Sequence, residues 1–203
     1  MSKLLEIKNL KKIYHDLNSE ILAIDNISLN IYKNHFISIV GPSGCGKSTL
    51  LSILAGLEDK SEGTIYNNEN IRIGYMLQTD SLFPWRTVLD NCLLGLEING
   101  ELNDINKKRV LTLLKNYGLF EFKDKYPNSL SGGMKQRVAL IRTLATDPDI
   151  LLLDEPFSAL DYQTRLTLSD DLYKIIKKEN KTVIMVTHDL AELRFFFNIK
   201  IIN

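Results

Sequence analysis

The sequence predicts an α/β fold with a largely parallel, doubly wound central sheet, an N-terminal antiparallel β part and an inserted helical subdomain. Three observations predict it. Apolar runs of strand length alternate with amphipathic runs of helix length, as in βαβ units. The first third of the chain reads as strands and turns, whereas a mostly helical block lies at about residues 84–145. At 203 residues the chain can bury the core of one domain, which we expect to span residues 1–203.

Each element follows from the period of its apolar residues, which is two in strands and about 3.6 in helices. The predicted strands lie at residues 4–6, 27–31, 36–40, 150–153 and 182–187. The predicted helices begin at Lys47, fill most of residues 87–117, begin again at Ser131 and run through about residues 168–176. A short hairpin is predicted at residues 64–76, around the polar turn at 67–70.

Helical spacing also predicts which side chains face the core. The inward positions are Leu50, Leu51, Leu54 and Leu57 in the first helix, Val110, Leu113 and Leu114 in the middle block, and Val138, Ile141 and Ala145 after Ser131.

Composition narrows the class of protein. Lys plus Arg and Asp plus Glu both number 25, so the chain lacks the basic excess typical of nucleic-acid binders, and we expect no nucleic-acid partner. The two cysteines, Cys45 and Cys92, do not form a disulfide framework, which favours a reduced, cytoplasmic setting. No signal peptide is predicted, and no apolar run reaches the roughly 18 residues that a spanning helix needs. A role at a membrane would therefore be peripheral.

A glycine-rich loop between the strand at 36–40 and the following helix fits Gly-x-x-x-x-Gly-Lys-Ser/Thr. Its backbone N–H groups and the start of the helix are suited to bind phosphate oxygens. We expect Lys47 to reach the β- and γ-phosphates of a nucleotide and the Ser48 hydroxyl to bind Mg²⁺. The predicted nucleotide-binding residues of the loop are Gly41, Pro42, Ser43, Gly44, Cys45, Gly46, Lys47, Ser48 and Thr49.

Two carboxylates, Asp154 and Glu155, end the buried strand at 150–153. The carboxyl ends of parallel strands form the crevice in which α/β proteins bind ligands. Asp154 is therefore a candidate Mg²⁺ ligand, and Glu155 a candidate general base that polarises the attacking water. A polar turn after a strand is the alternative interpretation.

A third pattern, Leu130-Ser-Gly-Gly-Met-Lys-Gln136, stands just before a predicted helix. Ser131 can cap that helix, and the two glycines expose N–H groups near its positive end, which would make a second anion site. A simple turn explains the residues equally well.

Taken in order, these motifs resemble those of ABC-type ATPases, and the resemblance runs from about Leu4 to Glu192. The third pattern is similar to the family's signature. Three further positions match as well: Gln78 lies in a Q-loop, Asp161 in a D-loop, and His188 stands at the switch histidine. The resemblance therefore implies a P-loop NTPase fold of the ABC type.

What the resemblance implies is hydrolysis of ATP with Mg²⁺ in a head-to-tail dimer. Glu155, Gln78, His188 and Lys47 would be the catalytic residues, with Gln78 also a metal ligand beside Ser48 and Asp154. Four residues would act on the ATP of the partner subunit, namely Ser131, Gly132, Gly133 and Asp161.

Tyr14 stands where the family places an aromatic residue that stacks on adenine; the alternative is a partly exposed aromatic. The apolar cluster Leu82, Phe83 and Trp85 follows Gln78. It is either a core cluster or, as in ABC importers, part of the groove that receives a coupling helix of the membrane permease subunits.

The segment Ser81-Leu-Phe-Pro-Trp-Arg86 looks like the ATPases of nitrate, sulfonate, taurine and bicarbonate importers. The resemblance implies a peripheral subunit at the cytoplasmic face of the cell membrane. It also implies an extracytoplasmic solute-binding protein as an indirect partner. Alternatives are a soluble ABC ATPase that acts on DNA or ribosomes, and a nucleotide-binding subunit with impaired hydrolysis.

The C-terminus departs from the family pattern. After about residue 192 the chain reads Leu193-Arg-Phe-Phe-Phe-Asn-Ile-Lys-Ile-Ile-Asn203, which is atypical or truncated. Loss of the family's last sheet strands would uncover apolar surface, so we expect lower stability or reliance on partners.

Overall fold

The computed structural model describes residues 2–16, 19–67, 71–157, 162–189 and 198–201. Its strands are β1 (Lys3–Asp16), β2 (Ser19–Tyr32), β3 (Phe36–Val40), β4 (Glu62–Asn67), β5 (Ile73–Met76), β6 (Ile150–Asp154), β7 (Thr182–Thr187) and β8 (Asn198–Ile201). Its helices are α1 (Lys47–Leu54), α2 (Val88–Ile98), α3 (Asp104–Asn116), α4 (Gly132–Ala145) and α5 (Tyr162–Glu179), with short 3₁₀ helices η1 (Phe120–Phe122) and η2 (Pro127–Ser129).

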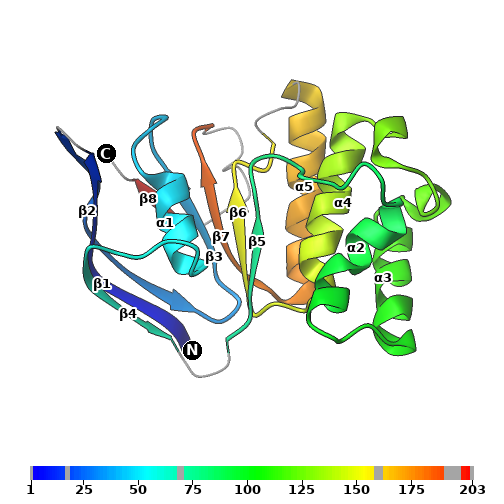
Figure 1. Ribbon diagram of the computed structural model, residues 1–203, viewed down its shortest axis with the longest axis horizontal. Coiled ribbons are helices and arrows are strands. Elements are labelled where there is room, and N and C mark those ends of the chain that lie inside the picture. The colour runs from blue at the N-terminus through cyan, green and yellow to red at the C-terminus, as the bar shows by residue number, and fades with distance from the viewer. Residues whose placement is uncertain (1, 17–18, 68–70, 158–161, 190–197, 202–203) are drawn as a thin grey trace.

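The strands form two sheets, which Figure 1 shows in the left and central parts of the molecule. Strands β2, β1 and β4 make an antiparallel sheet, in that order. The central sheet has the order β5-β6-β7-β3-β8, and its strands pair in parallel. The predicted fold class is therefore confirmed, and β3 and β6 end at the same edge of one sheet.

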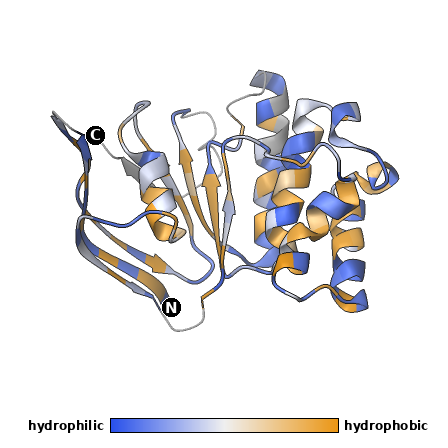
Figure 2. Ribbon diagram, in the orientation of Figure 1, coloured by the Kyte–Doolittle hydropathy of each residue, from blue (hydrophilic) through white to orange (hydrophobic). Residues whose placement is uncertain are grey.

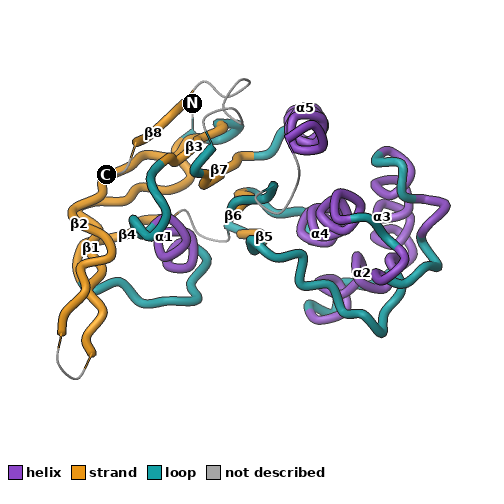
Figure 3. The backbone as a smooth tube through the Cα atoms, turned by 90° about the horizontal axis from the view of Figure 1, so that it is seen from above, coloured by secondary structure: helices purple, strands orange, loops and turns teal. Residues whose placement is uncertain are grey.

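The central sheet is buried on both faces, and the pleat divides its side chains between two cores. Ile150 and Leu152 of β6 pack with α1 and the antiparallel sheet. Leu151 and Leu153 point the other way, into a core shared with α2, α3, α4 and α5. Helix α1 consequently lies between the two sheets, and the other helices cover the opposite side (Figures 1 and 3). Figure 2 shows hydrophobic residues concentrated on the central strands.

Several helix starts have the caps that the sequence indicates. Ser131 accepts a hydrogen bond from the Met134 N–H, and Asn103 caps α3 by accepting from the Asn106 N–H. The predicted inward positions of α3 and α4 are buried: Val110, Leu113, Leu114, Val138, Ile141 and Ala145.

Two predictions about the first third of the chain are wrong. The segment 64–76 is not a hairpin, because β4 pairs with β1 in the antiparallel sheet whereas β5 pairs with β6 in the central sheet. Leu57 does not share the buried face of α1, because the helix ends at Leu54, Gly56 turns the chain at a φ of 72°, and Leu57 is 67% exposed.

The two N-terminal strands are longer than predicted, and the C-terminal end contains one strand that was not predicted. β1 and β2 have 14 residues each and carry several register shifts, so their period of two is broken and only residues 4–6 and 27–31 stood out. Residues 198–201, which the sequence analysis did not predict as a strand, form β8 beside β3. Residues 193–197 of the atypical tail lie outside the described residues.

The end of α1 at Leu54 can be tested by comparing substitutions on either side of it. Leu54→Ala removes a side chain that is 6% exposed and should lower the free energy of unfolding by about 2–5 kcal/mol, because it leaves a cavity. Leu57→Ala should change it by less than about 0.5 kcal/mol. Urea unfolding followed by circular dichroism measures both, and equal losses would contradict the observed end of the helix.

Candidate active site

The glycine-rich loop connects the end of β3 to the start of α1 in the structure. Lys47, the first residue of α1, is buried, and its Nζ donates hydrogen bonds to the carbonyl oxygens of Gly41 at 2.9 Å and Pro42 at 2.8 Å. The ammonium group is thus held over the loop backbone.

Two glycines of the loop, Gly44 and Gly46, have left-handed backbone conformations, but their surroundings differ. Gly44 has a φ of 82° and open space where a Cβ would be. Gly46 has a φ of 90°, and a Cβ there would lie 2.1 Å from the carbonyl oxygen of Ala23 in β2. The loop is therefore packed directly against the antiparallel sheet at Gly46, where only glycine fits.

Asp154 ends β6 beside the first turn of α1. Its Oδ1 accepts a hydrogen bond from the Ser48 hydroxyl at 2.9 Å, and its Oδ2 accepts one from the Tyr75 hydroxyl at 3.2 Å. Burial raises the pKa of Asp154, while the two hydroxyl donors oppose that rise. Burial also raises the pKa of Tyr75 to about 12, so its hydroxyl remains a donor at neutral pH.

The Ser48 and Asp154 pair fits a Mg²⁺ ion, which prefers oxygen ligands and often takes only one or two from the protein beside substrate phosphates. In the part of the chain that the structure describes, no group of three or more His, Cys, Asp or Glu side chains could hold a metal. An ion at this position would therefore need further oxygen ligands from a bound nucleotide or from water.

Glu155 lies at the centre of the predicted catalytic residues. Its Oε2 is 3.0 Å from His188 Nδ1 and accepts from Gln78 Nε2 at 3.5 Å, and its Oε1 is 3.7 Å from Lys47 Nζ. These residues come from the ends of β5, β6 and β7 and from the start of α1. The structure thus gathers all four at one edge of the central sheet.

The backbone of Glu155 has a φ of 42°, in the left-handed region that a non-glycine residue rarely occupies. Its N–H donates to the Val186 carbonyl oxygen of β7 at 3.0 Å, which ties the turn to the neighbouring strand. Such conformations cost about 1–3 kcal/mol and are typical of functional sites. The strained turn directs the Glu155 carboxylate towards His188 and Lys47.

Tyr14 near the end of β1 is fixed by partners that the sequence did not indicate. Its hydroxyl donates to Glu58, with distances of 2.8 and 2.6 Å to the two carboxylate oxygens, and lies 3.5 Å from Thr49 Oγ1. Burial and the Glu58 carboxylate raise the pKa of Tyr14. Lys12 Nζ lies 4.7 Å from the ring centroid. The tyrosine is therefore held beside the first turn of α1.

The predicted in-trans residues are placed elsewhere. Ser131 is exposed at the start of α4, and α4 and α1 lie on opposite sides of the central sheet (Figures 1 and 3). Within one chain, the structure does not bring Ser131, Gly132 and Gly133 to the glycine-rich loop. Asp161 lies outside the described residues.

The apolar cluster after Gln78 divides into buried and exposed parts. Leu82 is 9% exposed and belongs to the core of the helical layer, so it does not contribute to a docking surface. Trp85 is 70% exposed, and its ring centroid lies 5.1 Å from that of the half-buried Phe83. The exposed apolar surface of this cluster is therefore Trp85, beside the half-buried Phe83.

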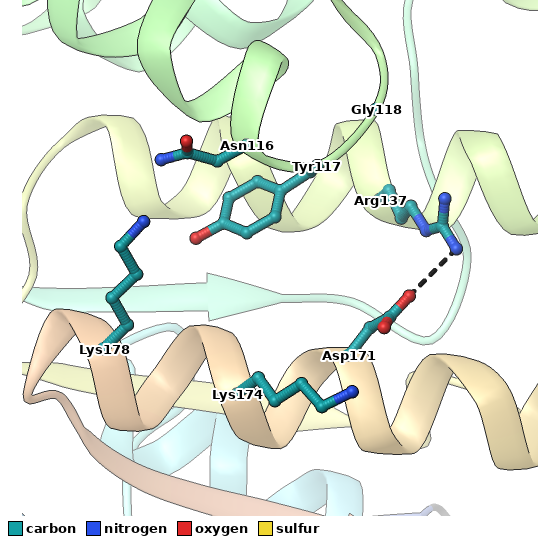
Figure 4. A pocket seen from close by; sticks show the side chains of 7 residues that line it. All are labelled: Asn116, Tyr117, Gly118, Arg137, Asp171, Lys174 and Lys178. Carbon is teal, nitrogen blue, oxygen red and sulfur yellow. Dashed lines mark hydrogen bonds and ion pairs between the residues drawn. The ribbon is translucent and has the colours of Figure 1, made fainter.

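A hollow of about 410 Å³ lies apart from these residues, between α5, α4 and the end of α3 (Figure 4). It is lined by Asn116, Tyr117, Gly118, Arg137, Asp171, Lys174 and Lys178. An ion pair of 3.0 Å between Arg137 and Asp171 crosses it and joins α4 to α5. None of the predicted site residues lines this hollow.

Comparison with known proteins decides the family. Residues 24–158 match a family model described as ABC transporter. This chain belongs to the ABC transporter family. It is 47% identical over 194 residues to an uncharacterized ABC transporter ATP-binding protein, YtlC, of Bacillus subtilis, covering 93% of this chain and 75% of that protein. It is 44% identical over 179 residues to the taurine import ATP-binding protein TauB of Rhizobium johnstonii, covering 85% and 68%.

Among solved structures, the ABC protein resembles the dimeric ATP-binding cassette MJ0796 in a post-hydrolysis state bound to ADP and Pi. The TM-score is 0.84 at 35% identity, with 98% of this chain and 94% of that chain covered. The chain is accordingly an ATP-binding subunit and an ATPase of the ABC type, as its sequence motifs predicted. No helix among the described residues has both the length and the apolar character needed to cross a membrane.

The contact at Gly46 predicts a difference between two substitutions in the loop of this ABC ATPase. Gly46→Ala should weaken ATP binding at least about 100-fold, because the new Cβ would push the loop away from Ala23. Gly44→Ala meets only backbone strain of about 1–2 kcal/mol and should weaken binding far less. Titration with a fluorescent ATP analogue measures both, and equal losses would show that the contact with Ala23 is unimportant.

Proposed function

We propose that this chain is the ATP-binding and hydrolysing subunit of an ABC importer for a solute of the nitrate, sulfonate or taurine kind. It would act at the cytoplasmic face of the cell membrane, with permease subunits and, indirectly, an extracytoplasmic solute-binding protein. The observation that carries the hydrolytic part is the convergence of Lys47, Ser48, Asp154, Glu155 and His188 at one sheet edge. The importer part rests on relatives that are import ATP-binding proteins for taurine, nitrate and aliphatic sulfonates.

The proposed reaction is attack of water on the γ-phosphorus of ATP. The new bond to the water oxygen replaces the bond to the β–γ bridging oxygen, so the products are ADP and phosphate. Lys47 exchanges its carbonyl partners at Gly41 and Pro42 for the β- and γ-phosphate oxygens. Ser48 and Asp154 would hold Mg²⁺, which would neutralise negative charge that develops on the phosphate oxygens. Tyr14 stacks on the adenine, its ring fixed by Glu58.

Glu155 accepts the proton of the attacking water as general base, since its carboxylate is the group towards which the other side chains converge. His188 donates from Nδ1 to the Glu155 carboxylate, which requires hydrogen on that nitrogen. With ATP bound, the ring would contact the γ-phosphate. Gln78 would bind the metal through its amide oxygen and position the attacking water.

The second half of the site comes from another copy of this chain. Ser131, Gly132 and Gly133 present the N-terminus of α4, a ready binding site for phosphate oxygens, on the outside of the molecule. Asp161 would bridge the two subunits. The dimeric form of the similar cassette supports this arrangement.

The general-base role predicts the behaviour of Glu155→Gln. The amide keeps the shape of the side chain but cannot take a proton, so kcat for ATP hydrolysis should fall by about 100-fold or more. MgATP binding should persist, and the closed dimer should accumulate. Steady-state phosphate release and analytical ultracentrifugation measure these effects.

The matched control is Glu62→Gln, an exposed glutamate of β4 that pairs with Lys11 and should leave kcat unchanged. Undiminished hydrolysis in Glu155→Gln would contradict the general-base assignment.

The proposed role in import predicts that cells lose solute uptake when this chain cannot hydrolyse ATP. Replacement of the chromosomal copy by the Glu155→Gln variant should abolish uptake of one labelled solute among nitrate, taurine and aliphatic sulfonates, because the permease would lose its energy source. The Glu62→Gln strain should take up that solute normally. Retained uptake of all three solutes, with hydrolysis lost in the purified variant, would overturn the assignment to this importer group.

A further inference from the structure

We propose that Arg142 and Asn91 are positioning residues that clamp residues 79–87, here called the clamped loop, to α4 and α2. The clamped loop then moves with α4 as one rigid body. The clamp itself is a property of the fold, whereas its use in coupling rests on the function proposed above. The clamped loop directly follows Gln78 and carries the exposed ring of Trp85.

Arg142 binds the first half of the clamped loop. From the last turn of α4, its Nη2 donates to the Asp80 carbonyl oxygen at 2.7 Å and its Nη1 to the Ser81 carbonyl oxygen at 2.8 Å. Burial lowers the pKa of the guanidinium, which lies half-buried between α4 and the clamped loop.

Asn91 binds the second half. Its side chain in α2 is fully buried, and Oδ1 accepts from the Phe83 N–H at 2.8 Å. Nδ2 donates to the carbonyl oxygens of Phe83 at 3.1 Å, Arg86 at 3.1 Å and Thr87 at 2.9 Å. One amide thus links three backbone positions on either side of Trp85. A hydrophobic residue there would leave buried carbonyl groups without these partners.

The clamped loop has little regular structure of its own between β5 and α2. Ser81 has a φ of 45°, the Asp80 side chain accepts from the Leu82 N–H at 3.1 Å, and Leu82 is the buried apolar anchor. These local contacts shape the turn, and the Arg142 hydrogen bonds connect its backbone to α4. Without Arg142 the turn would keep its form, but its first half would lose its direct hydrogen bonds to α4.

The clamp connects three proposed functional points. A push on Trp85 by a permease would reach α4 through Arg142, and α4 begins at Ser131, the proposed contact to the partner's ATP. It would also reach Gln78, two residues before Asp80. Docking and closure over ATP would then be coupled through a chain of hydrogen bonds and one rigid helix.

Trp85 is the only tryptophan of the chain, so its fluorescence reports on the clamped loop directly. Arg142→Met keeps the packing of the side-chain stem and removes all donors. In time-resolved anisotropy of the purified full chain without nucleotide, it should raise the fast, nanosecond amplitude of Trp85 about twofold or more. Arg142→Lys should give an intermediate value, because one ammonium cannot reproduce the fork geometry.

Arg109→Met is the matched control. Arg109 also donates to backbone carbonyls, those of Leu144 at 3.2 Å and Ala145 at 3.4 Å, and pairs with Asp147, but it does not touch the clamped loop. Its loss should leave the Trp85 decay unchanged. Decays of Arg142→Met that match those of wild type and Arg109→Met would overturn the clamp. If Arg142→Met does not fold, an anisotropy decay of Trp85 in Arg142→Lys equal to that of wild type would also overturn the clamp.

A kinetic readout separates the clamp from the proposed function. Arg142→Met should lower kcat about tenfold with the KM for ATP within about twofold, because Lys47 and Ser48 are untouched while Gln78 and Ser131 lose their connection. An unchanged kcat would overturn the coupling role even if the Trp85 decay changes. Failure of the importer assignment itself would appear only in the uptake assay, with the Trp85 result unaffected.

Discussion

The hydrogen bond between Ser48 Oγ and Asp154 Oδ1, at 2.9 Å, joins the glycine-rich loop and α1 to the acidic end of β6. Ser48 lies in the first turn of α1, and Asp154 is the last residue of β6. The two residues meet because α1 follows β3, and β3 and β6 run parallel and end at the same edge of the central sheet. The two sheets and the helical layer hold that edge in place. The chemistry at the edge depends on this alignment, because Glu155 is fixed by the same strand end.

Around this edge the structure combines rigidity with local strain. Gly46 presses the glycine-rich loop against the carbonyl of Ala23, and Glu155 occupies a left-handed conformation tied to β7. The Glu155 conformation is costly in isolation, and the buried strands on either side of it hold the turn in place. Preorganised groups of this kind suit phosphoryl transfer, in which the protein mainly positions and stabilises charge.

The sequence predicted the parts of the site that have local signals. The glycine-rich loop, the acidic end of β6 and the Ser131 cap each depend on a few neighbouring residues. Tyr75, Glu58 and Arg142 were missed because their partners lie far away in sequence: Tyr75 binds Asp154, and Arg142 binds the carbonyl of Asp80. Residues 64–76 were misread as a hairpin because alternation identifies strands but not the sheet that each strand joins.

The central claim is that Ser48 and Asp154 together hold the metal that accompanies ATP. Binding of Mn²⁺, used in place of Mg²⁺ and followed by electron paramagnetic resonance with ATP present, tests it most directly. Ser48→Ala and Asp154→Asn should each weaken Mn²⁺ binding about tenfold or more, while ATP binding with a chelator present stays within about twofold of wild type. Mn²⁺ affinities equal to that of wild type in both variants would contradict the claim.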